Sequence, residues 1–319
     1  MDVDLPAGRY VVAVSGGVDS AALLHLLAQK QSDSPIVRSS DSRATENAIR
    51  QSDNPTIQLI VAHFDHGIRE DSAEDRRLVQ ALAKKYGLPF VFAEGKLGPA
   101  ASEATARRAR YEFLEKTRRA AKANAVVTAH HQDDLLETVI LNLLRGTGRR
   151  GLSSLKSTDV IRRPLLHIPK SELLRYAERE GLRWHEDSTN ADERYLRNYI
   201  RQRILPRFAA KDREALLILS KWAAKQNRAI SEQVANYLHL QPGAGALDRH
   251  SFIMLPHAVA REVMAEWLLT NTGVELSKKL LERLVVAAKT GRRGSKVDVD
   301  AGHWLYISPD KLALWARER

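Results

Sequence analysis

Residues 11–27, "VVAVSGGVDSAALLHLL", decide the fold of the first part of this chain. The run 11–14 is apolar and valine-rich, which is typical of a buried β-strand, and 21–27 has the composition of a helix. Two adjacent glycines, Gly16 and Gly17, lie between them. Because a turn without side chains lets a ligand approach the backbone, the stretch indicates a binding loop between a strand and a helix.

The composition is that of a globular protein. The chain has 319 residues, 44% of them hydrophobic, which leaves room for two or three domains. No apolar run approaches the roughly 18 residues of a membrane span. The opening "MDVDLPAGRY" lacks a secretory pattern. We therefore expect a cytoplasmic protein with no membrane partner.

Cysteine content and charge narrow the range of possible functions. The sequence has no cysteine, which excludes disulfides, cysteine-ligated zinc, iron–sulfur clusters and persulfide chemistry carried by this chain. The net charge is +11, and residues 145–213 alone hold 17 Lys and Arg against 9 Asp and Glu. A basic surface that is merely solvated is the alternative interpretation, but such clustering favours binding of a polyanion, in particular a nucleic acid.

Apolar segments rich in β-branched residues alternate with helical patterns in the first 150 residues. We expect strands at 10–14, 57–63, 89–93 and 125–129, and helices at 21–30, 73–86, 102–123 and 134–144. This alternation predicts an α/β fold with a parallel sheet covered on both faces. Such a sheet binds ligands beyond the carboxyl ends of its strands.

The remaining segments suggest the domain organisation. Residues 31–56 are rich in Ser, Asp and Asn without an apolar period, so we expect a mobile surface insertion. We place a main domain at 1–210, a helical connector at 211–240 and a small α+β domain at 241–319. The last domain should hold helices at 256–271 and 277–289, followed by a hairpin of "SKVDVD" and "HWLYIS".

The loop "SGGVDS", residues 15–20, is the strongest candidate for a phosphate site. The free N–H groups of a first helical turn and the helix dipole favour an anion there. It differs from the GxxxxGK[ST] loop, because no lysine is present to contact the phosphates. A tight turn capped by Asp19 or Ser20 is the alternative interpretation.

A second cluster, "HHQDD" at 130–134, follows the fourth expected strand. His130 and Asp134 share a face if a helix begins near Gln132. Capping carboxylates and a buried structural histidine would explain this stretch alone. However, Asp65 and His66 leave a neighbouring strand at the same sheet edge, so three carboxylates and three histidines should converge near the phosphate loop. Carboxylate oxygens suit magnesium better than zinc.

Several motifs together resemble one family. They are "AVSGGVDS", "HFDHGIREDSAED" (63–75), "SEATARRARYEFL" (102–114), "TAHHQDDLLETVILNLLRGTGRRGL" (128–152), "RRPLL" (162–166) and "EDSTNADERYLRNYIRQRILP" (186–206). In this order they resemble the tRNA(Ile)-lysidine synthetase family of the N-type ATP pyrophosphatases, or PP-loop superfamily, over residues 9–210. The resemblance implies an adenine nucleotide alpha hydrolase-like fold for a PP-loop ATP pyrophosphatase catalytic domain at 1–210, and a tRNA-binding role for the C-terminal domain at 241–319. It also implies ATP and Mg²⁺ as cofactors, with CAU-anticodon tRNA(Ile) and free L-lysine as substrates.

The resemblance also implies site residues. Pyrophosphate would be held by Ser15, Gly16, Gly17, Val18, Asp19 and Ser20, with Asp19 also placing the metal. The reaction and lysine site would include Asp65, His130, Asp134, Arg197 and Arg201. A solvated helix face is the usual reason for arginines at helical spacing, but we favour contacts to tRNA for Arg107, Arg110, Arg149, Arg150, Arg162, Arg163 and Arg194.

Three other functions fit the sequence less well than the one that this resemblance implies. A tRNA thiolase of the same superfamily is disfavoured because the chain has no cysteine. The missing cysteine also argues against a glutaminase-dependent amidotransferase. A non-catalytic RNA-binding protein would not need intact "SGGVDS" and "HHQDD" motifs.

Overall fold

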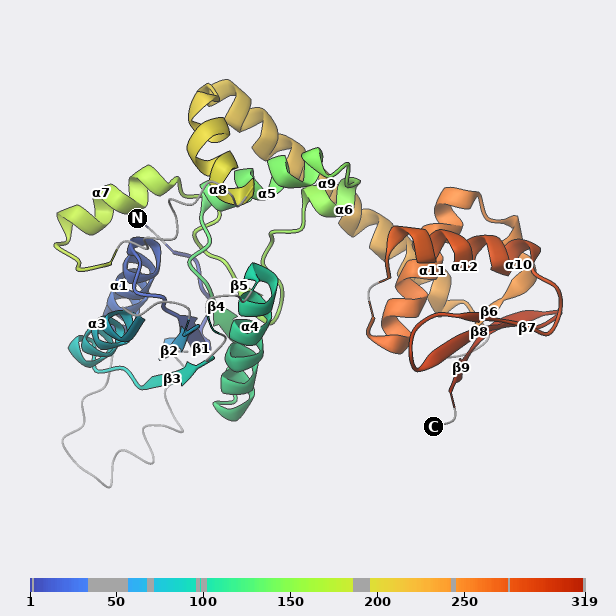
Figure 1. The fold of residues 1–319 in the computed structure, drawn as a ribbon, viewed down its shortest axis with the longest axis horizontal. Coiled ribbons are helices and arrows are strands. Elements are labelled where there is room, and N and C mark those ends of the chain that lie inside the picture. Colours follow the sequence, from blue (N-terminus) through green and yellow to red (C-terminus); the bar gives the residue numbers. More distant parts are fainter. Residues whose placement is uncertain are drawn as a thin grey trace. The chain divides into compact units, whose positions relative to one another are not determined.

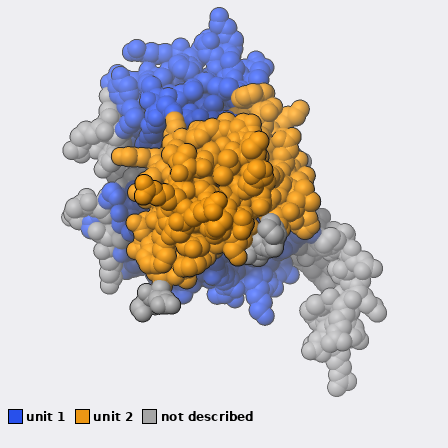
Figure 2. Space-filling view, turned by 90° about the vertical axis from the view of Figure 1, so that its right-hand side faces the viewer, with its two compact units in different colours: residues 1–220 blue, residues 221–319 orange. Residues whose placement is uncertain are grey.

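The computed structural model describes residues 1, 3–33, 57–67, 72–95, 98, 102–185, 196–241, 245–274 and 276–317. They form two compact units, Met1–Ser220 and Lys221–Arg319 (Figure 2). Most of the expected insertion, residues 34–56, lies outside the described residues. Its first three residues belong to the end of helix α1 (Val18–Asp33), so the helix is longer than expected. No helix among the described residues is both long and apolar enough to cross a membrane.

The first unit is built on a five-stranded parallel sheet with the strand order β3-β2-β1-β4-β5. The strands are β1 (Gly8–Ala13), β2 (Ile57–Asp65), β3 (Phe90–Glu94), β4 (Ala125–Val127) and β5 (Ile161–Arg162). Four match the expected positions, and the two-residue β5 was not expected. The predicted α/β fold is confirmed.

Side chains that alternate along residues 10–14 pack against helices on both faces of the sheet. Tyr10, Val12 and Val14 belong to a core shared with α1, α3 (Ser72–Lys85) and α7 (Lys170–Arg179). Val11 belongs instead to a cluster with Leu114 of α4 (Glu103–Ala120). Figure 1 accordingly shows α1 and α3 on one side of the sheet and α4 on the other. This two-residue period is that of a strand buried on both faces.

A third cluster joins helices that follow the sheet. Leu136 and Ile140 of α5 (Gln132–Leu144) pack with Ile200 and Leu205. Residues Leu196–Tyr199 (α8), the π-helical turn Ile200–Ile204 and the 3₁₀ turn Leu205–Arg207 run in succession. Their packing on α5 fixes this arginine-rich segment beside the helix that begins with "QDD". The short helix α6 (Arg149–Leu152) follows α5.

The long helix α9 (Ala210–His239) occupies the expected connector, and the boundary between the two units falls within it. The second unit has an antiparallel sheet with the order β6-β9-β8-β7. Its elements are β6 (Ala246–Asp248), α10 (Arg249–Met254), α11 (His257–Thr272), α12 (Lys278–Thr290), β7 (Ser295–Asp298), β8 (His303–Ile307) and β9 (Lys311–Ala316). The two expected helices and the expected β7–β8 hairpin are present, whereas β6, α10 and β9 were not foreseen.

Candidate active site at the carboxyl edge of the sheet

The strand order reverses between β1 and β4, and ligands of such sheets bind at this kind of reversal. From β1 the chain builds β2 and β3 on one side, and then crosses to build β4 and β5 on the other. At such a reversal the loops after the two central strands diverge, which leaves room for a ligand beyond their carboxyl ends. "SGGVDS" follows β1 and "HHQDD" follows β4, so both candidate motifs lie at this edge.

The loop 15–20 has a shape that requires glycine. Gly16 is buried with φ +98°, and a Cβ atom there would lie 3.3 Å from Oδ1 of Asp75. Gly17 precedes the first residue of α1, Val18, so the N–H groups of the first turn are left without partners inside the helix. The Ser15 and Ser20 hydroxyls are 3.2 Å apart, and Ser20 Oγ donates to Gly17 O over 2.9 Å. The loop therefore offers hydroxyl groups and helix-start N–H groups of the kind that bind an anion.

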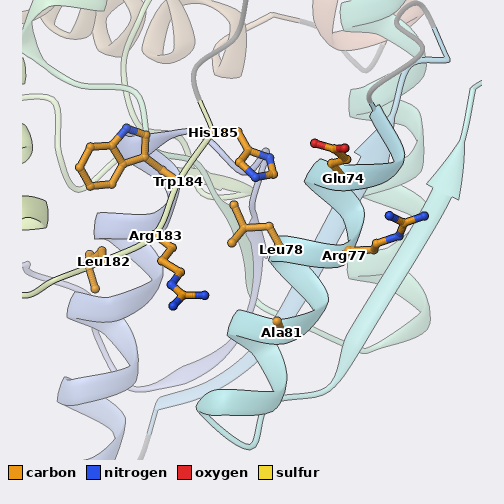
Figure 3. A pocket seen from close by; sticks show the side chains of 8 residues that line it. All are labelled: Glu74, Arg77, Leu78, Ala81, Leu182, Arg183, Trp184 and His185. Carbon is orange, nitrogen blue, oxygen red and sulfur yellow. The ribbon is translucent and has the colours of Figure 1, made fainter.

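A brace holds this loop from the α3 side. The His185 N–H donates to Gly16 O over 3.0 Å, and His185 Nδ1 lies 2.9 Å from Asp75 Oδ1. An open pocket of about 620 Å³ lies next to the brace, lined by α3 and residues 182–185 (Figure 3). None of the predicted site residues lines it.

His131, one of the histidines expected near the phosphate loop but given no role there, links the two motifs. Its Nε2 lies 3.4 Å from Oδ2 of Asp19 and 3.5 Å from Oδ2 of Asp134. It is also the N-cap of α5, since the Asp134 N–H donates to its Nδ1 over 3.4 Å. Burial opposes the charged form of His131, but the hydrogen bond to Asp19 and the charges of Asp134 and Asp19 raise its pKa above the ordinary value. The phosphate loop and α5 are thus joined by one side chain.

Two carboxylates and two arginines form the centre of the site. Glu137 is 0% exposed, and its carboxylate accepts from Nε of Arg197 over 3.0 Å and from Nε of Arg201 over 2.6 Å. Asp134 Oδ1 accepts from Nη2 of the same arginines, over 3.4 and 3.2 Å respectively. Asp134 and Glu137 are three residues apart, and the arginines are four apart, so each pair lies on one helix face. We call these four residues the acid–arginine cluster.

The local helix geometry supports this arrangement. Arg201 lies in a π-helical turn, a feature frequent at functional sites. Although burial disfavours the charged guanidinium, the hydrogen bond to Glu137 and the nearby carboxylates raise the pKa of Arg201. Burial opposes ionisation of Asp134, but His131 and its other cationic neighbours lower its pKa. Asp134 and Arg201 therefore stay ionised at neutral pH.

His130 lies beside this cluster in a neutral form. Its Nδ1 is 2.8 Å from Thr128 Oγ1. Burial lowers the pKa of His130 to about 3, with Arg163 also lowering it and Asp134 acting in the opposite sense. An uncharged imidazole at this place can exchange a hydrogen bond or a proton with a substrate.

The expected convergence of three carboxylates and three histidines does not include Asp133. Asp133 points elsewhere: its Oδ1 accepts from the Lys170 N–H over 3.3 Å, and its Oδ2 lies 3.8 Å from Arg213. Asp65 is 8% exposed and accepts from the Gly67 N–H over 2.8 Å, at the end of β2 on the other side of β1. Ion pairs through His131 and the two arginines connect the carboxylates of Asp19, Asp134 and Glu137.

The arginines expected to contact tRNA are found in different settings. Arg107 and Arg110 stack on Tyr111 of α4, with guanidinium carbons 4.9 and 5.4 Å from the ring centre. Arg163 departs from the expectation of a surface contact, because it is 8% exposed and donates to Lys156 O. Of the others, Arg149 and Arg150 lie on α6, Arg162 pairs with Asp159 over 4.0 Å, and Arg194 is outside the described residues.

The residues present fit a magnesium ion held jointly with phosphates. Asp19 Oδ1 is buried without a hydrogen-bond partner among the described residues. The described part of the chain has no group of three or more His, Cys, Asp or Glu that could hold a metal unaided. Magnesium commonly takes one or two carboxylates and completes its shell with water and substrate phosphates. Asp19 is the residue that would hold it here.

The fold and the lysine-free phosphate loop at the strand-order reversal define a nucleotide-binding α/β domain. The family model described as "PP-loop domain" matches residues 2–208, and the chain belongs to this family.

Named relatives agree with this assignment. The tRNA(Ile)-lysidine synthase of Solibacter usitatus is 32% identical over 298 residues, covering 92% of this chain and 59% of that protein. That of Thermotoga sp. strain RQ2 is 37% identical over 211 residues, covering 63% and 46%. That of Deinococcus deserti is 32% identical over 322 residues, covering 98% and 53%. The chain thus spans about half the length of the curated relatives it matches.

A solved structure shares the fold. The U34-tRNA thiolase NcsA from Methanococcus maripaludis, with its 4Fe-4S cluster, has a TM-score of 0.51 and 18% identity. The match covers 70% of this chain and 73% of that one. At this identity the likeness shows the fold alone.

Proposed function

We propose that this chain joins lysine to the wobble cytidine of a CAU-anticodon tRNA(Ile) at the expense of ATP, giving lysidine, AMP and pyrophosphate. The observation that carries the proposal is the acid–arginine cluster beside the phosphate loop, because it combines a site for an ammonium with cations for a phosphoryl group. The names of the relatives support the same reaction. Such a reaction belongs to the cytoplasm, where tRNA, ATP and free lysine are present.

The first step is adenylation of the base. The C2 oxygen of cytidine attacks the α-phosphorus of ATP, a new P–O bond forms, and the bond to the β-phosphate breaks. The amides of residues 16–19 and the Ser15 and Ser20 hydroxyls would hold the departing pyrophosphate. Arg197 and Arg201 would stabilise charge on the transferring group. Magnesium held by Asp19 would neutralise phosphate charge when bound.

The second step forms the C–N bond. The lysine ε-amine attacks C2, the C2–O bond breaks, and AMP departs. At a reference pKa of about 10.4, making the amine neutral at pH 7 costs roughly 4.6 kcal/mol, at about 1.36 kcal/mol per pH unit. A carboxylate must first select the ammonium and a base must then take its proton. We assign the selection to Asp134, with Asp65 as the second candidate for either role and neutral His130 at hand for proton exchange.

Incorporation of labelled lysine into a tRNA(Ile) transcript tests the proposal. The assay supplies ATP and magnesium, with a cytidine-to-uridine anticodon transcript as the control. We expect label in the first transcript only, and its loss in Asp134→Asn. ATP cleavage to AMP and pyrophosphate without label would retain adenylation but exclude lysine as the second substrate.

RNA binding without any ATP cleavage would instead indicate a non-catalytic RNA-binding protein. The thiolase alternative remains disfavoured, because the sequence has no cysteine to carry sulfur or a cluster.

A further inference from the structure

The sheet of the second unit has two unlike faces. One face carries Leu247, Leu305, Ile307 and Leu312, which are fully buried in the core shared with α11 and α12. The register places the opposite side chains together: Lys296 with Tyr306, Asp298 with Trp304, and Trp304 with Trp315. We call the set Lys296, Trp304, Tyr306, Trp315 and Arg317 the aromatic–basic face.

Its aromatic rings and cations are in direct contact. The rings of Tyr306 and Trp315 stack with centroids 4.1 Å apart and planes inclined by 16°. The Lys296 ammonium lies 4.8 Å from the ring centre of Trp304 and 4.9 Å from that of Trp315. The Arg317 guanidinium lies 5.2 Å from that of Trp304. These cation–π contacts place positive charge over the rings of Trp304 and Trp315.

The face is oriented and open. Trp304 Nε1 donates to Asp298 Oδ1 over 2.8 Å, and Arg317 pairs with the same carboxylate, so the indole is fixed in place. Trp315 is 42% exposed, which is unusual for so large an aromatic side chain. Asp298 is engaged by Trp304 and Arg317, and Asp248, which also points outward, caps α10 through the Ser251 N–H. The outward cations Lys296 and Lys311 therefore give the face a positive character.

Flat rings bordered by cations have a definite chemical complement. Unpaired nucleobases stack on tryptophan and tyrosine, and their phosphates pair with lysine and arginine. The outward aliphatic side chains beside Tyr306 are the small Ala313 and Ala246, which offer a protein partner little to pack against. Charge complementarity thus favours RNA.

We propose that the aromatic–basic face binds unpaired nucleotides of the RNA substrate by stacking, at a place other than the reacting base. The inference rests on the proposed function for the identity of the RNA as tRNA(Ile). Its physical content, stacking of unpaired bases on Trp315 and Tyr306 with phosphate contacts from Lys296, is independent of the reaction.

The test compares Trp315→Ala with a matched control, Trp222→Ala, in the full chain. Trp222 lies on α9 and is 53% exposed, so both variants remove an exposed indole. We expect Trp315→Ala to weaken binding of the tRNA(Ile) transcript and of a short unstructured RNA about tenfold, whereas Trp222→Ala leaves both affinities unchanged. Trp315→Phe should restore most of the affinity, and binding of a fully paired RNA duplex should not respond.

A second variant keeps the test valid if Trp315→Ala perturbs folding. Lys296→Gln should reduce the slope of log affinity against log salt for the unstructured RNA by about one. Equal RNA affinities for Trp315→Ala, Trp222→Ala and the unsubstituted chain would overturn the inference and leave the face to a protein partner. RNA binding that depends on Trp315 in a chain that incorporates no lysine would reject the proposed function while retaining this inference.

Discussion

At the scale of single residues, Glu137 controls the geometry of the candidate site. Both arginines approach its buried carboxylate, so without it the two guanidinium groups would lose the acceptor that they share and that orients them toward Asp134. We expect Glu137→Gln to lower the single-turnover rate of lysine incorporation about 100-fold, because a small displacement of reacting groups has effects of that order. Binding of ATP to the loop 15–20 should be unchanged. The matched control is Glu112→Gln, since the Glu112 side chain is 73% exposed on α4.

A rate for Glu137→Gln within a factor of three of the unsubstituted chain would show that the acid–arginine cluster is structural only. Quench-flow measurement at saturating ATP distinguishes this result from a change in nucleotide affinity.

His131 makes stability depend on pH. Its pKa is raised in the folded chain, chiefly by Asp19 and Asp134 against the effect of burial. The stabilisation is therefore complete below the ordinary histidine value of about 6.5, and it is lost as pH rises through the raised value. Replacement by asparagine keeps an N-cap acceptor for α5 but removes the charge. Urea unfolding should show a larger loss of stability for His131→Asn at pH 6 than at pH 9, and an equal loss at both would contradict the ion pairing.

At the scale of elements, the sequence anticipated those with a strong local pattern. The strands around 10–14 and 57–63 and the helix 134–144 are long and periodic, and the structure has them. The strand β5 was missed because it has two residues, and β9 because "KLALWA" is as apolar as a helix segment. The apolar spacing of Leu173, Tyr176 and Ala177 is typical of a helix, so α7 could have been predicted from the sequence.

The candidate site was only partly predictable for a physical reason. Gly16 and Asp134 can be predicted as site residues, because they lie in a glycine loop and at an acidic helix start. Glu137 looks like one polar position in an apolar helix, and its partners lie sixty residues or more along the chain. Which of His130 and His131 faces Asp19 depends on where α5 begins, and a one-residue difference decides it. Spacing alone does not contain that information.

Arg249 ties several elements of the second unit together. Its guanidinium is buried and donates to the carbonyls of Ala288, Ser308 and Gly291 over 3.4, 3.1 and 2.7 Å. Arg249→Leu would leave these oxygens without their donor, so we expect a loss of about 2–4 kcal/mol in stability. Tryptophan fluorescence during urea unfolding measures it, since four of the five tryptophans lie in this unit. Exposed Arg293→Leu is the control, and similar midpoints for the two variants would contradict the role of Arg249.

At the scale of the whole molecule, the charge distribution should decide how RNA is bound. The chain carries +11, with the largest excess in residues 145–213, which include the arginines of the active-site edge. Release of counterions by such a surface makes RNA affinity fall steeply with salt. We expect the affinity for the tRNA(Ile) transcript to fall at least a hundredfold between 50 and 200 mM salt, whereas ATP affinity, which depends on a local loop, changes much less.

Paired substitutions show which charged residues are responsible for the salt dependence of RNA affinity. Arg149→Gln with Arg150→Gln, on α6, should reduce the salt slope by about two. Lys84→Gln with Lys85→Gln removes the same charge from the end of α3, where a helix that follows a parallel strand has returned to the amino edge of the sheet. Equal reductions by both pairs would mean that net charge alone governs binding. A reduction confined to the α6 pair would place the RNA backbone beside α6, which follows the helix that carries Asp134 and Glu137 of the acid–arginine cluster.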